Sequence, residues 1–171
     1  MPKQIDLQPT LTGTLLELRP LHTDEFEELY AAAADPLIWE LHPEKERYQR
    51  PVFEKYFKEA IESRGALVAI DRETKKIIGC SRFHSLDTTK SEITIGYTFL
   101  ARSHWGGRYN GEMKKLMIDH AFKFVSAIHF LIGETNLRSR RAIEKIGARL
   151  IGPEPTPTHK HIHLVYRIER R

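Results

Sequence analysis

A glycine pair between a hydrophobic strand pattern and an amphipathic helix pattern is the strongest structural constraint in this sequence. The stretch Leu100–Phe124 reads LARSHWGGRYNGEMKKLMIDHAFKF. Gly106 and Gly107 allow a sharp turn and place no Cβ between the backbone and a ligand. The first amides of a helix have no partner within it, and the helix dipole makes that end positive. The pattern therefore predicts a strand–turn–helix junction that binds phosphate through the amides of Trp105–Asn110, with Arg108 adding charge.

Length and composition favour a soluble, cytoplasmic protein with a single domain over residues 1–171. The chain is 40% hydrophobic and 29% charged, as is usual for globular domains. No apolar run approaches the ~18 residues of a membrane span, and the start of the sequence has no signal-peptide pattern. We therefore expect no membrane partner. Cys80 is the one cysteine, which excludes an intrachain disulfide, and its strand setting predicts burial.

The charge balance is mildly basic, with a formal net charge of +4 and a pI of about 9.2. This surplus suits either a nucleic acid or a small ligand with several phosphates. An arginine cluster at Arg138, Arg140 and Arg141 and the basic C-terminal residues would support the first. Basic and acidic residues are nevertheless interleaved, and no nucleic-acid-binding motif is present. The phosphorylated small ligand is the favoured interpretation.

Hydrophobic periodicity predicts a mixed α/β (α+β) fold with about six to seven strands and about four helices. The predicted strands are 15–21, 66–70, 76–85, 91–100, 130–134, 148–151 and 161–168. The predicted helices are 23–34, 52–63, the segment from the glycine pair to 124, and 137–146, with a short helical turn at 37–41. A rigid loop is expected over 152–157.

A second motif follows in GETNLRSRRAIEKIGARL, from Gly133 to Leu150. Asn136 can cap a helix and offer its amide to a ligand. Ser139 lies one turn further on the same face, and Arg140 or Arg141 could contact a phosphate. An ordinary capped helix with solvated arginines fits the same residues.

The two motifs together resemble the acetyl-CoA site of the GNAT acetyltransferases. The first is similar to the family signature R/Q-x-x-G-x-G/A, with Gly106 at the first glycine position. Two positions depart from it: Ser103 stands where Arg or Gln is usual, and Arg108 stands where Gly or Ala is usual. The second, Asn136–Gly147, resembles N-x-x-S-x-x-A-x-x-K-x-G. Further similarity covers residues 10–169 and points to the ribosomal-protein N-acetyltransferase branch.

The resemblance implies a GNAT fold and direct transfer of an acetyl group from acetyl-CoA to a primary amine in a ternary complex. A backbone amide near Phe99–Ala101 would stabilise the oxyanion. The implied cofactor-binding residues are Phe99, Leu100, Ala101, Trp105, Gly106, Gly107, Arg108, Tyr109, Asn110, Asn136, Ser139 and Arg141.

The catalytic groups are less well marked. A lysine-like amine must lose its proton before it attacks, which costs roughly 4–5 kcal/mol at pH 7, so a general base helps. Glu92, in a position where the family often has a carboxylate, and His84, whose side-chain type titrates near neutrality, are the two candidates. Glu92 could equally be a solvated turn residue and His84 a half-exposed strand residue. The tyrosine that the family usually uses as the acid has no match at 142–144, so the acid is elsewhere or water returns the proton. Tyr97 and Tyr109 are candidates, although both could equally be packing residues.

Several alternatives stay open. A non-catalytic acetyl-CoA-binding module would keep both motifs without a base. Trp39 and His42 are candidates for the acceptor groove, although Trp39 could equally belong to the core. The alternating His159, His161 and His163 are interpreted as a solvent-facing stripe, and no metal is expected. The acceptor is a small molecule or a protein N-terminus, and a homodimer is left open.

Overall fold

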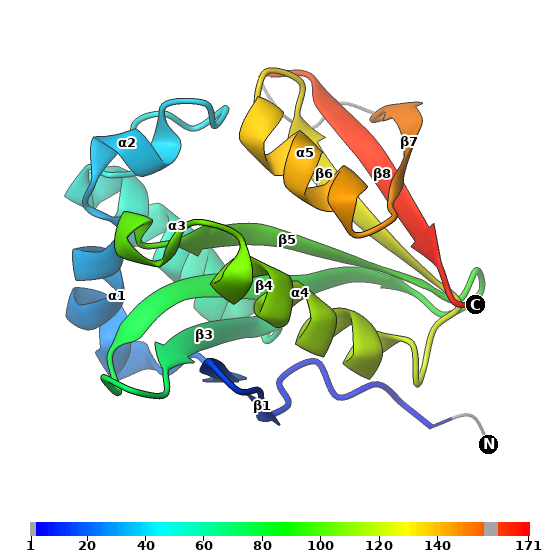
Figure 1. Cartoon of the computed structure of the whole chain (residues 1–171), viewed down its shortest axis with the longest axis horizontal. Coiled ribbons are helices and arrows are strands. Elements are labelled where there is room, and N and C mark those ends of the chain that lie inside the picture. The colour runs from blue at the N-terminus through cyan, green and yellow to red at the C-terminus, as the bar shows by residue number, and fades with distance from the viewer. Residues whose placement is uncertain (1–2, 156–160) are drawn as a thin grey trace.

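A single mixed sheet organises the computed structural model, which describes residues 3–155 and 161–171 (Figure 1). The strand order in the described part is β1-β2-β3-β4-β5-β6-β8-β7. The strands are β1 (Leu11–Thr12), β2 (Leu16–Pro20), β3 (Ala66–Asp71), β4 (Ile77–Asp87), β5 (Glu92–Leu100), β6 (Ala127–Gly133), β7 (Arg149–Pro153) and β8 (His163–Glu169). Only β5 and β6 pair in parallel, and the other neighbours are antiparallel.

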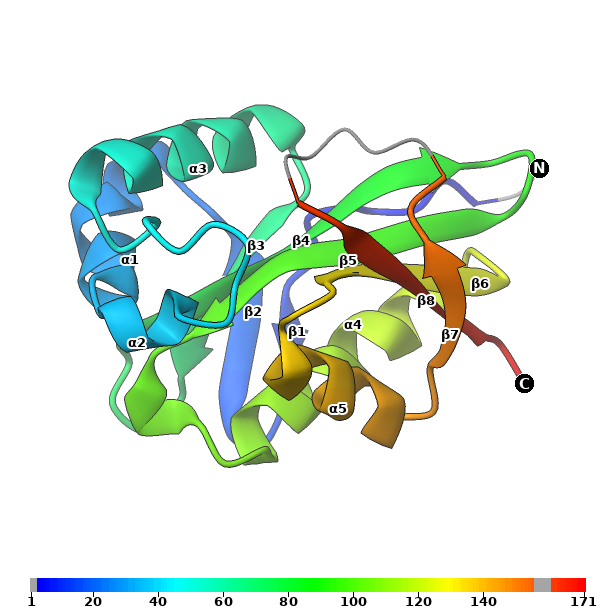
Figure 2. The same ribbon diagram turned by 90° about the horizontal axis from the view of Figure 1, so that it is seen from above.

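Helices cover both faces of this sheet (Figure 2). They are α1 (Phe26–Ala33), α2 (Pro36–Trp39), α3 (Arg50–Ser63), α4 (Arg108–Ala121) and α5 (Leu137–Lys145), with short 3-10 turns η1 (Thr23–Glu25) and η2 (Arg102–His104). Figure 2 shows α1, α2 and α3 grouped on one side and α4 with α5 on the other. No helix in the described ranges is long and apolar enough to cross a membrane.

Two hydrophobic cores result from this arrangement. On the α4 side, Met113 and Met117 pack against sheet residues that include Leu18 and Ile93. On the other side, the aromatic residues of α3 pack against β3, β4 and β5, with Phe53 fully buried. Burial on both faces explains why β3 and the first half of β4 are continuously apolar rather than alternating.

The strands β5 and β6 separate soon after they begin. They pair only over Glu92–Thr94 and Ala127–His129, and Figure 1 shows the two ribbons diverging beyond that point. The β6-facing edge of β5 is therefore left without a strand partner from Ile95 onward. Tyr97 has a φ of 55°, which is uncommon for a residue with a side chain, and the β4–β5 register shifts beside it. This irregularity bends β5 away from its neighbour at the place where the pocket opens.

The fold class predicted from the sequence is confirmed, and the differences are local. The described part has eight strands, one more than the upper expected number, because two-residue β1 is too short to show alternation. The turn expected at 37–41 is helix α2, which Asp35 caps by accepting from the Leu37 amide at 3.0 Å and which Pro36 begins. Strand β7 continues to Pro153, where a loop was expected from residue 152.

Candidate functional site

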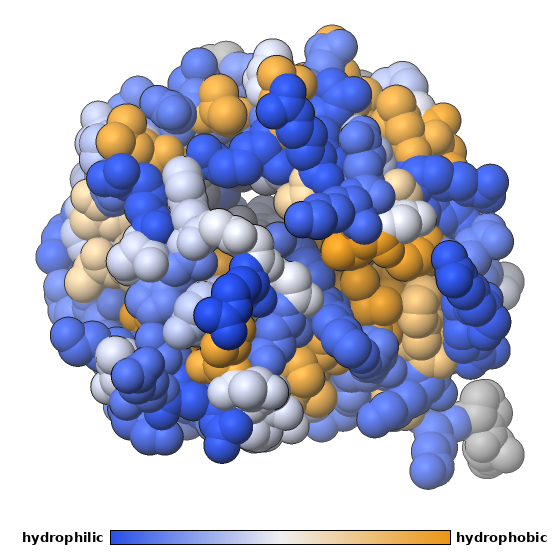
Figure 3. Space-filling model, in the orientation of Figure 1, coloured by the Kyte–Doolittle hydropathy of each residue, from blue (hydrophilic) through white to orange (hydrophobic). Residues whose placement is uncertain are grey.

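A cavity of about 260 Å³ lies where β5 and β6 separate. Ile95–Leu100 of β5 and Phe130–Gly133 of β6 form two of its walls, and residues from α2, α4 and α5 complete it. Figure 3 shows the surface hollowed between α2 and α5. The separation of two parallel strands thus produces a pocket whose lining includes both apolar residues, such as Ile95 and Phe130, and polar ones, such as Asn110 and Ser139.

The predicted cofactor-binding residues gather mostly at this cavity. Those that line it are Phe99, Leu100, Trp105, Gly106, Gly107, Asn110, Asn136 and Ser139. Those that are not among its lining residues are Ala101, Arg108, Tyr109 and Arg141. The Ala101 amide donates to the Ile78 carbonyl at 2.8 Å, so it is not available to a ligand.

The glycine turn has the conformation that the sequence pattern requires. Gly106 and Gly107 have φ values of 114° and 98°, a region that residues with a Cβ rarely adopt. Gly107 is the N-cap of α4 and no side chain caps the helix there, so its first amides are left for another acceptor. The Trp105 amide, which the sequence also suggested for phosphate, instead donates to the Arg102 carbonyl at 3.1 Å.

The second motif caps α5 as predicted. Asn136 is 6% exposed, and its side-chain oxygen accepts from the Ser139 amide at 3.4 Å. Arg140 is held by the Tyr166 hydroxyl and the Glu134 carbonyl, both at 3.0 Å. Arg141 is exposed on the far side of the helix from the pocket lining. Of this motif, Asn136 and Ser139 therefore line the pocket, and Arg140 and Arg141 do not.

Arg138 is a pocket residue that the motif analysis did not select. Its guanidinium carbon lies 3.9 Å from the centre of the Trp105 ring, and Nη2 donates to the Ile38 carbonyl at 3.1 Å. These contacts join α5, α2 and the glycine turn across the mouth of the pocket. The sequence offered one signal, since Arg138 falls between Asn136 and Ser139, the two motif positions that line the pocket.

Lys114 is the second residue that the sequence analysis missed. It is 8% exposed, lines the pocket from α4, and donates from Nζ to Thr98 Oγ1 at 2.7 Å. No carboxylate pairs with it in the described part of the chain, and burial lowers its pKa to about 7. A lysine beside Met113 in the apolar face of α4 was the available signal, because charged residues are rarely buried without a reason.

The two base candidates lie in different places. Glu92 Oε1 accepts from Arg167 Nη1 at 2.5 Å at the start of β5, outside the pocket lining. The structure therefore does not bring Glu92 to the cavity. His84 lies beside the cavity wall, with its ring 5.2 Å from that of Tyr97 and Nε2 over Gly96, where an added Cβ would lie 3.0 Å away. Gly96 and Tyr97 both line the pocket.

Trp39 and His42 reach the pocket from the α2 side. Trp39 is 1% exposed and donates its indole N–H to the Ala33 carbonyl at 2.9 Å, so it is both a core residue and part of the lining. Burial lowers the pKa of His42 to about 3, and the charges of Arg47 and His163 act in the same direction. His42 is therefore neutral at physiological pH, with Nδ1 accepting from the Glu44 amide at 2.9 Å.

The structure describes two of the three alternating histidines. His159 lies outside the described residues, His161 is exposed ahead of β8, and His163 lines the pocket. The solvent-facing interpretation therefore does not hold for His163, because β8 turns that position toward the cavity.

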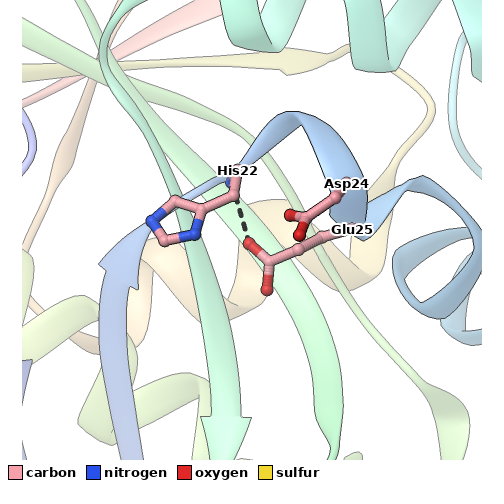
Figure 4. A group of neighbouring side chains, drawn as sticks. All are labelled: His22, Asp24 and Glu25. Atoms are coloured by element: carbon pink, nitrogen blue, oxygen red, sulfur yellow. Dashed lines mark hydrogen bonds between the residues drawn. The ribbon is translucent and has the colours of Figure 1, made fainter.

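Within the described ranges, one group of potential metal ligands occurs away from the pocket, at His22, Asp24 and Glu25 (Figure 4). Glu25 accepts from the His22 amide at 2.8 Å and pairs with Arg19 at 2.6 Å. Its carboxylate thus closes the first turn of a helix, a role that accounts for its position without an ion.

Comparison with known proteins agrees with this geometry. A family model described as an acetyltransferase (GNAT) domain matches residues 16–149. No curated protein matches the sequence.

Three solved structures illustrate the likeness in fold. A GCN5-related N-acetyltransferase from Brucella melitensis is 20% identical, with a TM-score of 0.79, covering 95% of this chain and 79% of that one. An acetyltransferase from Agrobacterium tumefaciens is 25% identical, with a TM-score of 0.74 and 95% of each chain covered. A proposed ribosomal-protein-serine acetyltransferase from Vibrio cholerae is 14% identical, with a TM-score of 0.73, covering 94% of this chain and 97% of that one.

Proposed function

The chain belongs to the GNAT acetyltransferase family, and from that premise we propose that it transfers an acetyl group from acetyl-CoA to a primary amine. One observation carries the proposal. The cavity between β5 and β6 brings together the glycine turn of α4 and Asn136 with Ser139 of α5, although the two motifs are separate in sequence. Both motifs thus contribute to one site.

Acetyl-CoA would lie along the opening between the two strands. Its pyrophosphate would accept hydrogen bonds from the uncapped amides at the start of α4. The open edge of β5 offers main-chain groups to the amides of the pantetheine arm, as an exposed strand does to an extended peptide. Asn136 would contact the same arm from α5.

Transfer would proceed by direct attack of the amine on the thioester carbonyl. The Ala101 amide is already bonded to β4, and successive amides of a strand point to opposite edges, so the Leu100 amide faces the opening. We assign to it the stabilisation of the oxyanion. Cys80 is buried, which raises the pKa of its thiol to about 11, and this disfavours an acyl-enzyme route.

His84 is our candidate for the base, because it lies beside the Gly96–Tyr97 wall. The tyrosine that usually serves as the acid in the family has no match in this sequence. We assign its role, acting on the leaving CoA thiolate, to Lys114. Its protonated Nζ would stabilise the negative sulfur or give it a proton. The Thr98 and Ser81 hydroxyls, 2.8 Å apart, hold Lys114 at the pocket wall.

The test combines binding with turnover. The melting temperature should rise with CoA concentration, and free CoA should be released from acetyl-CoA in the presence of an acceptor from a panel of primary amines. A CoA-dependent shift without release of CoA on any amine would support the non-catalytic binding module instead. No shift at millimolar CoA would contradict both.

A further inference from the structure

Two arginines that lie behind the pocket lining, Arg47 and Arg82, have no anionic partner among the described residues. Arg82 of β4 is 5% exposed, and its Nε and Nη2 atoms are buried without a hydrogen-bond acceptor. Arg47, between α2 and α3, forms no ion pair with any residue in the described ranges. Burial lowers the pKa of Arg47, and Glu44 raises it only as a charge at longer range. Two uncompensated guanidinium groups are therefore held in one region.

Aromatic rings hold both groups beside the cavity. The Arg82 guanidinium carbon lies 3.9 Å from the centre of the Tyr97 ring, and that of Arg47 lies 5.2 Å from the centre of the Trp39 ring. Tyr56 lies between them, with its ring centre 5.6 Å from Arg82 and 4.9 Å from Arg47. Its hydroxyl donates to the Tyr97 carbonyl at 2.6 Å, which fixes the aromatic arrangement.

This cluster lies on the acceptor side of the proposed site. Tyr97 of β5 and Trp39 of α2 both line the cavity, and the phosphate-binding turn follows β5 and η2 further along the chain, at Gly106 and Gly107. The arginines are thus not needed for the phosphates of CoA. A buried charge without a partner is costly, and that cost is removed when an anion binds and supplies the missing acceptors.

We propose that Arg47 and Arg82 bind a carboxylate on the acceptor, so that the substrate is a primary amine that also carries an acidic group. The inference rests on the proposed acetyl transfer. A guanidinium presents its N–H donors in the fork geometry that matches a carboxylate, which suits Arg for this role better than Lys. A free amino acid supplies such a carboxylate, and so does an acidic second residue of a peptide.

The experiment compares matched acceptors. Amino acids are assayed against their carboxamides, and Ala-Asp-amide is assayed against Ala-Asn-amide, with putrescine as a cationic amine. We expect kcat/KM to favour the carboxylate member of at least one pair by about tenfold or more. Arg47→Met should reduce that ratio to near one by raising KM for the carboxylate acceptor, without changing KM for its amide. The pair that responds identifies the source of the carboxylate.

Two controls keep the result interpretable. Arg50→Met is matched, because Arg50 also lies over two rings, Phe26 and Tyr30, but it pairs with Glu27 and neither of its rings lines the cavity. It should leave the ratio unchanged. Arg82→Met should lower the same kcat/KM ratio as Arg47→Met. A normal CoA-dependent thermal shift of the Arg82→Met variant establishes that this variant is folded.

Failure of the carboxylate site and failure of the acetyl-transfer reaction can be told apart by a binding measurement. Calorimetry measures the binding of an N-acetylated amino acid and of its methylamide. Turnover without a carboxylate preference would overturn the inference and leave acetyl transfer standing. No turnover, with carboxylate binding that Arg47→Met abolishes, would overturn the transfer reaction alone. Equal binding of the acid and the methylamide, with no carboxylate preference in either acceptor pair, would contradict the anion site.

Discussion

The Glu92 carboxylate and the Arg167 guanidinium are joined by a hydrogen bond of 2.5 Å that connects β5 to β8 across the intervening strand β6. Arg167 Nη1 also lies 2.9 Å from His129 Nε2 on β6. The Glu92 and Arg167 side chains are only 18% and 24% exposed, so water screens the pair incompletely. This contact stabilises the closed end of the β5–β6 pair, opposite the end at which the strands separate.

Glu92→Gln is therefore expected to weaken the fold rather than the chemistry. Loss of the charge should lower the free energy of unfolding by about 1 kcal/mol, measured with denaturant. The maximum rate and CoA affinity should stay near their original values. Glu169→Gln, at a more exposed partner of Arg167, is the control and should have a smaller effect. A fall in rate of roughly 10²–10⁴-fold that high pH reverses would instead identify Glu92 as the base.

Glu92 also shows what local sequence pattern could not reveal. Its place at the start of a strand was predicted correctly, because strand periodicity is a local property. Its partner Arg167 is 75 residues away, and only the strand order β5-β6-β8 brings them together. The conformation of the glycine turn and the Asn136 cap were predicted correctly because each motif is contiguous. Lys114, Arg47 and Arg82 were missed because their environment depends on tertiary packing.

Gly106→Val should remove CoA binding. Its φ of 114° is unfavourable for a β-branched residue, with a strain of roughly 1–3 kcal/mol that would distort the turn. The added side chain would also stand where phosphate is expected to approach. The measurement is the thermal shift caused by CoA. Gly111→Ala in the first turns of α4 is the control, because a Cβ there meets nothing within 4 Å and should leave the shift intact.

Two substitutions separate the helix-capping role of Asn136 from its proposed role in binding CoA. Asn136→Ala removes both the cap and the amide, so stability should fall by about 1 kcal/mol and CoA should bind more weakly. Asn136→Asp retains an oxygen that can accept from the Ser139 amide, so stability should be preserved while CoA affinity still falls. Denaturant unfolding and CoA titration measure the two effects. If Asn136→Asp binds CoA normally, the residue is a cap alone.

Lys114 should make folding stability depend on pH. The unfolded chain keeps the lysine proton up to its ordinary pKa of 10.5, whereas the folded chain keeps it only up to about 7. Between these values the unfolded state binds more protons, so the stability of the natural protein rises with pH. Lys114→Met removes this dependence and should be more stable than the natural protein near neutral pH, by a few kcal/mol, with the advantage shrinking toward pH ~10.

Denaturant unfolding at about pH 6.5 and about pH 9.5 checks this expectation. Lys115→Met is the matched control, because Lys115 is 74% exposed and pairs with Asp119. Its stability difference from the natural protein should be the same at both pH values. A Lys114→Met difference that is equally independent of pH would show that the buried amine is not destabilised by its surroundings.

His84→Gln tests the remaining base candidate. Its ring lies against Tyr97 and over Gly96, both in the pocket wall, so glutamine can fill part of the space but cannot take up a proton near neutrality. We expect the acetylation rate to fall by roughly 10²–10⁴-fold at pH 7, with the CoA-dependent thermal shift retained. The loss should shrink at higher pH, because a lysine-like acceptor then deprotonates without help. Full activity at every pH would mean that the acceptor arrives as the free amine and that catalysis depends on positioning and on the Leu100 amide.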